Sequence, residues 1–71
     1  SMAAVVDKQH ADDVFSRPWA SFDPVRAGEQ IGVRADGSAE LAAFDGRILF
    51  PDAAAGANCE WYYLCRSNPD F

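Results

Sequence analysis

Few side chains in this sequence could carry out chemistry, and the only histidine is His10. Asp12 and Asp13 follow it closely, and a histidine beside two carboxylates is a conceivable metal-binding group. One short stretch of chain rarely makes a site alone, because metal sites need three or four ligands held in a fixed geometry. We therefore predict no metal site and no catalytic residue here, and the 71-residue chain should not bind zinc stoichiometrically.

The two cysteines, Cys59 and Cys65, are six positions apart and have no CxxC partner or histidine pair that would suggest a metal site. They fall in one continuous strand-like run, and extended chain holds two thiols at that spacing too far apart for a disulfide. We predict free thiols that pack as small apolar side chains, which is typical of a reducing cytoplasm.

The charge of the chain excludes several classes of partner. Its net charge is −5 and its six basic residues are spread evenly, so there is no basic patch for nucleic acid. No apolar run is long enough to cross a bilayer, and no signal peptide is recognisable. The acidic residues are scattered and form no pair suited to acid–base catalysis, so we interpret them as solubilising charge. We predict a cytoplasmic protein that binds neither nucleic acid nor membrane.

The elements that would position these residues are short strands. Residues 1–13 lack large apolar groups and any period, so we predict a tag remnant and a disordered linker, or at most one helical turn. Residues 14–66 should form the β-domain, and 67–71 a loose tail. Strands are predicted at 30–34, 39–43, 47–50 and 60–66, the last of these with Trp61, Tyr63 and Cys65 on one face.

Turn signals separate these strands. Gly28, Gly37 and Gly46 are each predicted to adopt the positive φ of a tight turn, the last two after an aspartate, whereas Gly56 lies in a flexible loop over 52–58. The fold class is therefore all-β: a small barrel-sandwich hybrid or β-sandwich of five to six short strands. The predicted core is formed by the large apolar side chains Phe22, Ile31, Val33, Leu41, Ile48, Phe50, Trp61 and Tyr63.

Three segments together resemble a known family. They are Pro24–Gly32 (PVRAGEQIG), Phe44–Pro51 (FDGRILFP) and Glu60–Leu64 (EWYYL). In this order they are similar to the C-terminal domain of the succinylglutamate desuccinylase/aspartoacylase family, which is barrel-sandwich-hybrid-like. The resemblance covers about residues 15–66.

The resemblance implies a larger zinc-dependent amide hydrolase whose catalytic domain holds the metal and acts on small N-acyl amino acids. The histidine–glutamate zinc motif of that family is absent from this chain, so zinc would belong to the parent's catalytic domain. By resemblance, this domain would pack on the catalytic domain and shape substrate access. Arg47, Glu60 and Trp61 are the residues that could line the rim of the substrate channel.

A second hypothesis is a free-standing β-barrel binding or interaction module that forms homo-oligomers, for instance through an exposed strand edge or an aromatic surface patch. A lipoyl-like or biotinyl-like carrier is excluded, because modification needs a lysine at a hairpin tip and the only lysine is Lys8.

Overall fold

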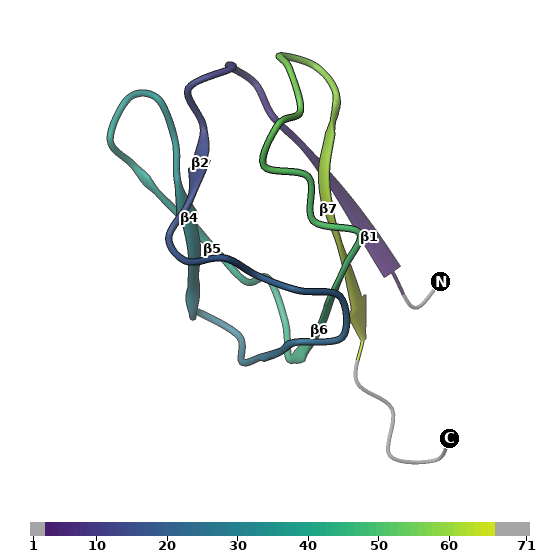
Figure 1. The fold of residues 1–71 in the computed structure, drawn as a ribbon. Coiled ribbons are helices and arrows are strands. Elements are labelled where there is room, and N and C mark those ends of the chain that lie inside the picture. Colours follow the sequence, from purple (N-terminus) through teal and green to yellow (C-terminus); the bar gives the residue numbers. More distant parts are fainter. Residues whose placement is uncertain (1–2, 67–71) are drawn as a thin grey trace.

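This computed structural model describes residues 3–66, and over that range the chain consists of strands and turns without a helix (Figure 1). The all-β prediction is confirmed. The strands are β1 (Ala3–Asp7), β2 (Val14–Phe15), β3 (Pro24–Val25), β4 (Gln30–Val33), β5 (Ala39–Leu41), β6 (Gly46–Leu49) and β7 (Glu60–Arg66). Residues 3–66 contain no helix that could span a membrane.

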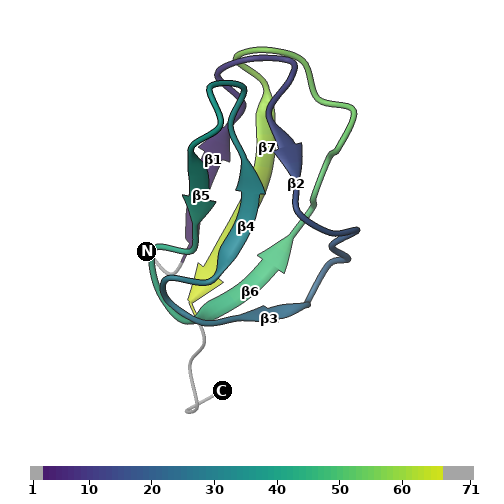
Figure 2. The same ribbon diagram turned by 90° about the vertical axis from the view of Figure 1, so that its left-hand side faces the viewer.

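Two antiparallel sheets form the layers of a small sandwich. The larger sheet has the strand order β1-β7-β6-β3, and the smaller has the order β2-β4-β5. Figure 2 looks onto the smaller sheet with the larger sheet behind it. Each sheet has one face toward the other sheet, so alternate side chains of both layers meet in a common core.

The core between the sheets is rich in aromatic residues. Ile31, Ile48 and Trp61 are completely buried, as predicted. The indole N–H of Trp19 donates a hydrogen bond to the Ile31 carbonyl oxygen at 2.9 Å, which ties the 16–23 segment to the smaller sheet. Further buried apolar residues complete the cluster: Val25, Ala42, Tyr62 and Leu64.

An irregularity between β1 and β7 turns two consecutive aromatic side chains inward. Val6 pairs with Tyr62, but the next residue, Asp7, pairs with Glu60, so Trp61 is an extra residue on β7. A β-bulge of this kind breaks the alternation of side chains and re-aims one of them. Trp61 and Tyr62 are both buried as a result. Our prediction that Tyr63 shares the face of Trp61 is therefore wrong.

Part of the predicted core lies on the surface. Phe22, Leu41 and Phe50 are exposed, so their assignment to the core is wrong. Strand β5 presents Glu40, rather than Leu41, to the interior, where the Glu40 carboxylate accepts hydrogen bonds from other side chains. Two further members of the predicted core, Val33 and Tyr63, are half-buried.

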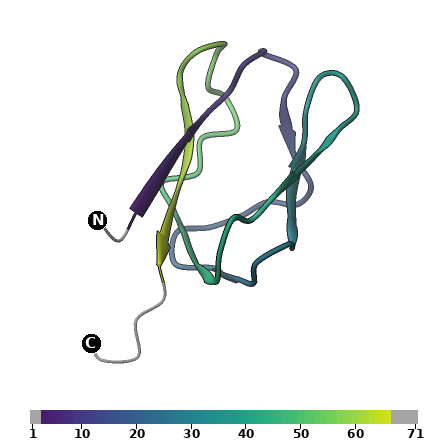
Figure 3. The same ribbon diagram turned by 180° about the vertical axis from the view of Figure 1, so that it is seen from behind.

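The start of the chain is more ordered than its composition suggested. Strand β1 pairs with β7 over its whole length, as Figure 3 shows in purple and yellow. Lys8 and Asp13, which follow β1, are almost completely buried. The prediction of a loose linker is therefore wrong for residues 3–13. An isolated strand has no intrinsic stability, and β1 forms because β7 offers it an open edge.

The turn predictions hold except at one glycine. Gly37 has a φ of +91° in the turn between β4 and β5, as expected, and Gly28 also has a positive φ. Gly46 lies instead at the start of β6 and has no positive φ. A Cβ there would collide with the carbonyl oxygen of Cys65 on β7, so glycine is needed for close approach of two strands. At Gly56 a Cβ would meet open space.

Candidate functional site

The side of the larger sheet that points away from the smaller sheet carries a row of apolar side chains, and we call this side the outer face. Val5 on β1 pairs with Tyr63 on β7, and Tyr63 pairs in turn with Leu49 on β6. Residues directly opposite in neighbouring strands point to the same side of a sheet. Cys65 and Arg47 form the next pair along these strands. No second layer covers this row among residues 3–66.

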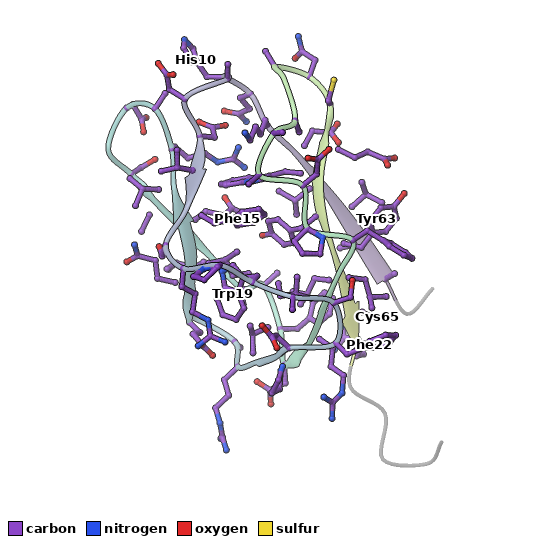
Figure 4. The ribbon with its side chains drawn as sticks, viewed as in Figure 1. His10, Phe15, Trp19, Phe22, Tyr63 and Cys65 are labelled. Atoms are coloured by element: carbon purple, nitrogen blue, oxygen red, sulfur yellow. The ribbon has the colours of Figure 1, made fainter. Side chains whose placement is uncertain are left out.

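Two phenylalanines extend the row. Phe22 and Phe50 are each 68% exposed, the most exposed of the large apolar side chains in residues 3–66. The Phe50 ring lies edge-on to the Tyr63 ring, with 5.6 Å between their centroids. In Figure 4, Phe22, Tyr63 and Cys65 lie on the side of the larger sheet that points away from the interior residues Phe15 and Trp19.

Both phenylalanines are held in a strained backbone conformation. Phe22 has a φ of 76° and Phe50 a φ of 50°, a region that bulky L-residues rarely adopt. Such residues persist only where their surroundings fix them, and they concentrate at functional sites. The Phe22 N–H donates to the Ile48 carbonyl at 2.7 Å, and the Phe50 N–H donates to Ser21 Oγ at 3.1 Å. These bonds hold the two residues in the conformation that leaves their rings exposed.

The charged residues of the outer face lie at opposite ends of its strands. Asp7 and Glu60 pair at one end, where both carboxylates are exposed. The Tyr63 hydroxyl donates to Glu60 Oε1 at 3.0 Å, and this bond is the main reason that the pKa of Tyr63 is raised. Arg47 lies toward the other end and donates to the Phe22 carbonyl at 3.0 Å. The face therefore runs from acidic through apolar to basic.

A second cluster, buried beneath β4 and β5, has the opposite character. Asp13 is 1% exposed and accepts a 2.8 Å hydrogen bond from Arg34, whose guanidinium also bonds Glu40. The Tyr62 hydroxyl donates to Glu40 at 2.8 Å. We call Asp13, Arg34, Glu40 and Tyr62 the buried polar cluster. Beside it lies a depression of about 270 Å³, lined by Gln9, His10, Asp13, Arg34, Ala35, Asp36 and Ser38.

The electrostatics of the buried polar cluster are those of a structural bridge. Burial opposes ionisation of Asp13, but backbone N–H groups of Ala35, Gln9 and His10 and the Arg34 side chain all donate to its carboxylate. Together they hold its pKa well below the usual range. Burial, and then the bond to Glu40, raise the pKa of Tyr62. A carboxylate that accepts this many bonds has no capacity left to act as a base, so we assign the cluster no catalysis.

The structure does not bring the predicted rim residues together. Arg47 and Glu60 are exposed on the outer face, but toward opposite ends of it. Trp61 is completely buried and cannot contact a substrate from this position, so its assignment to a rim is wrong. The bulge in β7, which no local sequence pattern indicates, turns it inward.

The potential metal ligands are separated or already bonded. Within residues 3–66 there is no group of three or more histidine, cysteine, aspartate or glutamate side chains that could hold a metal ion. Asp13 is bonded to Arg34, whereas His10 Nδ1 accepts a hydrogen bond from the Asp12 N–H at 3.2 Å. Cys59 and Cys65 are both free thiols, as predicted, but Cys59 is exposed, so the prediction that it packs as an apolar side chain is wrong.

The residue pattern did not indicate that Phe22 and Phe50 are exposed or that Tyr63 points to the outer face, because large aromatic residues in and between strand-like runs are usually buried. Phe50 precedes Pro51, and Phe22 stands two residues before Pro24. A proline restricts the residue before it and suggests a turn, but it does not specify a positive φ. The pattern therefore contained a signal for turns at these positions and none for exposure.

No family model, no curated protein and no solved structure matches this chain. The resemblance to the succinylglutamate desuccinylase/aspartoacylase family therefore gains no support from these comparisons.

Proposed function

We propose that this chain is a non-catalytic interaction domain that docks on another protein surface through the outer face of its larger sheet. The observation that carries the proposal is the exposure of Phe22 and Phe50 on that face in strained backbone conformations. A domain of this size gains most of its stability by burying aromatic rings, so two rings left in water are a loss unless a partner covers them.

The polar groups support a binding role rather than a catalytic one. The buried polar cluster links the segment after β1 to strands β4 and β5 through bonds that its own members satisfy. On the outer face, Asp7, Glu60 and Arg47 surround an apolar centre. An apolar centre with a charged rim is the usual composition of a protein–protein interface.

Photo-crosslinking tests this proposal. Benzoylphenylalanine, a photoreactive aromatic residue, is introduced in place of Phe50 in cells that carry the gene, and in place of Val14 as the control. Val14 is also exposed, but it lies on β2 in the other sheet. We expect a discrete adduct from position 50 and none from position 14. Mass spectrometry then identifies the captured protein, and its binding is repeated with purified components. Equal capture at both positions, or none at either, would contradict the proposal.

The sequence resemblance would make the partner the catalytic domain of a zinc-dependent amide hydrolase, with zinc and the N-acyl amino-acid substrate bound there. This is a prediction that rests on the three sequence motifs alone. An activity screen of the parent protein against N-acyl amino acids, with and without a zinc chelator, would test it. Zinc-dependent hydrolysis by the 71-residue chain itself would contradict the non-catalytic role.

A further inference from the structure

The arrangement of charge on the outer face restricts which partner fits it. Along β7 the order is Glu60, then Tyr63, then Cys65 beside Arg47 on β6. With a rise of about 3.3 Å per residue, the acidic and basic ends are roughly 15 Å apart, and Tyr63 lies near the middle. If an identical face approaches with its strands reversed, each acidic end meets a basic end and the two apolar centres coincide.

We propose that the occupant of the outer face is a second copy of this chain, bound face to face about a two-fold axis that lies in the interface and runs perpendicular to β7 near Tyr63. This inference rests on the proposed docking role of the outer face. In such an isologous contact, Asp7 and Glu60 of one copy face Arg47 of the other, and the reverse contact forms at the other end. Phe22 and Phe50 of both copies are then covered together.

The apolar area is consistent with such a contact. At about 200 Å² for an aromatic side chain, the two exposed phenylalanines offer roughly 270 Å². Val5, which is 49% exposed, and the half-buried Leu49, Tyr63 and Cys65 add to this area. A standard interface buries about 800 Å² on each partner and is a little more than half apolar. The two phenylalanines thus supply more than half of the apolar area that one side of a standard interface needs, and their neighbours on the outer face supply part of the rest.

The net charge of the chain limits the affinity. At a net charge of −5, two copies repel one another at long range. At physiological ionic strength this repulsion is screened beyond about 8 Å, whereas charge pairs in contact across an interface are screened much less. Mutations that reverse the charges at the two ends of the outer face should therefore change the affinity of the dimer more than changes in net charge alone.

Sedimentation equilibrium over a series of protein concentrations tests the inference. We expect the wild-type mass to rise from one chain to two. Arg47→Glu places acid against acid at both ends, and the double change Asp7→Lys with Glu60→Lys places base against base. Each of the two variants should therefore associate at least about tenfold more weakly than the wild type. An equimolar mixture of the two variants should restore the dimer, because each acidic face then meets a basic one. Val14→Ser, on the other sheet, should leave association unchanged.

Circular dichroism establishes that each variant is folded. If one of them is not, the single chain that carries all three reversals serves instead, since it exchanges the two ends and should dimerise like the wild type. A wild-type chain that stays monomeric up to its solubility limit overturns the inference, and so does a dimer that the charge variants leave intact. If position 50 crosslinks to a different protein, the proposal that the partner is a second copy is overturned, whereas the docking role of the outer face stands. If position 50 gives no adduct at all, both proposals are overturned.

Discussion

The outer face and the buried polar cluster reverse the usual distribution of side chains. On the outer face, aromatic rings are in water, whereas in the cluster Asp13 carries its charge inside the protein. The Asp13 carboxylate accepts a hydrogen bond from four separate donors, while the rings of Phe22 and Phe50 find little among residues 3–66 to cover them. A buried charge with all its partners present is costly to disrupt, but an exposed ring without a cover is available to another molecule. The comparison supports a structural role for the cluster and the proposed binding role for the face.

The largest effect should come from Asp13→Ala. This change leaves the Arg34 guanidinium without one of its two carboxylate partners and deprives three backbone N–H groups of their acceptor. Breaking a buried ion pair by removing one partner typically costs about 3 to 5 kcal/mol. Urea unfolding should show a loss of this size, and the exposed neighbour Asp12→Ala should change the free energy of unfolding by less than about 0.5 kcal/mol. Equal losses would show that the cluster is not structural.

Gly46 lies where β6 comes close to β7, and a substitution there tests the pairing of these two strands of the larger sheet. Gly46→Ala forces a methyl group against the Cys65 carbonyl oxygen, which is backbone and cannot move aside without disturbing the β6–β7 pairing. Overpacking of this kind costs about 1 to 3 kcal/mol. Gly56→Ala, which meets open space, should be nearly neutral. Thermal unfolding of both variants measures the difference, and a neutral Gly46→Ala would show that the two strands are less closely paired.

The pH dependence of stability should separate Asp13 from other carboxylates. Because the folded-state pKa of Asp13 is depressed, its contribution is complete above the unfolded value of about 3.9 and is lost as the pH falls through the folded value. The difference in the free energy of unfolding between wild type and Asp13→Asn should be constant from about pH 5 to pH 7 and should shrink below about pH 4. A difference that grew in acid would contradict this sign.

The adjacent tyrosines offer a matched pair across the two regions. Tyr62 donates to Glu40 inside the molecule, and Tyr63 donates to Glu60 at the surface, at 2.8 and 3.0 Å. Tyr62→Phe should cost about 1 kcal/mol, because Glu40 loses a bond that water replaces poorly. Tyr63→Phe should cost less than about 0.5 kcal/mol, because water reaches Glu60. Chemical denaturation measures the free energy of unfolding of both variants. A larger loss for Tyr63→Phe than for Tyr62→Phe would contradict the distinction between the two regions.

The smallest effect should be that of Phe50→Ala. The core assignment from sequence predicts a loss of about 3 to 5 kcal/mol, whereas the observed exposure of 68% predicts a change within about 0.5 kcal/mol. Ile48→Ala, two residues earlier and completely buried, serves as the control and should cost about 2 to 5 kcal/mol. A Phe50→Ala loss as large as that of Ile48→Ala would place the ring in the core and remove the candidate binding face.

The sequence predicted the local elements well. Strands expected at 30–34, 39–43, 47–50 and 60–66 lie within one or two residues of β4, β5, β6 and β7. The positive φ of Gly37 followed from an aspartate–glycine pair between two strand-like runs. These features depend on residues that are neighbours in sequence, because alternation and turn geometry act over a few peptide units.

The candidate site was largely beyond prediction. Arg47 and Glu60 were singled out and do lie on the outer face, but the aromatic residues that dominate it were assigned to the core. Their exposure depends on backbone conformations that long-range hydrogen bonds fix. The Phe50 N–H bonds Ser21 Oγ and the Phe22 N–H bonds the Ile48 carbonyl oxygen, and in both cases the partner is distant in sequence. Hydrophobicity alone favours burial for any phenylalanine, so only the surrounding structure distinguishes an exposed one.

By itself, then, the sequence determined an all-β chain, its turns and the buried positions Ile31 and Ile48, because periodicity and glycine placement are local properties. Only the tertiary structure decided that residues 3–7 form a strand, since an edge strand exists through the partner that it pairs with. It likewise decided that Trp61 turns inward and Tyr63 outward. One extra residue between two paired strands reverses the faces of the residues beyond it, and that residue is defined by the register between segments more than fifty positions apart.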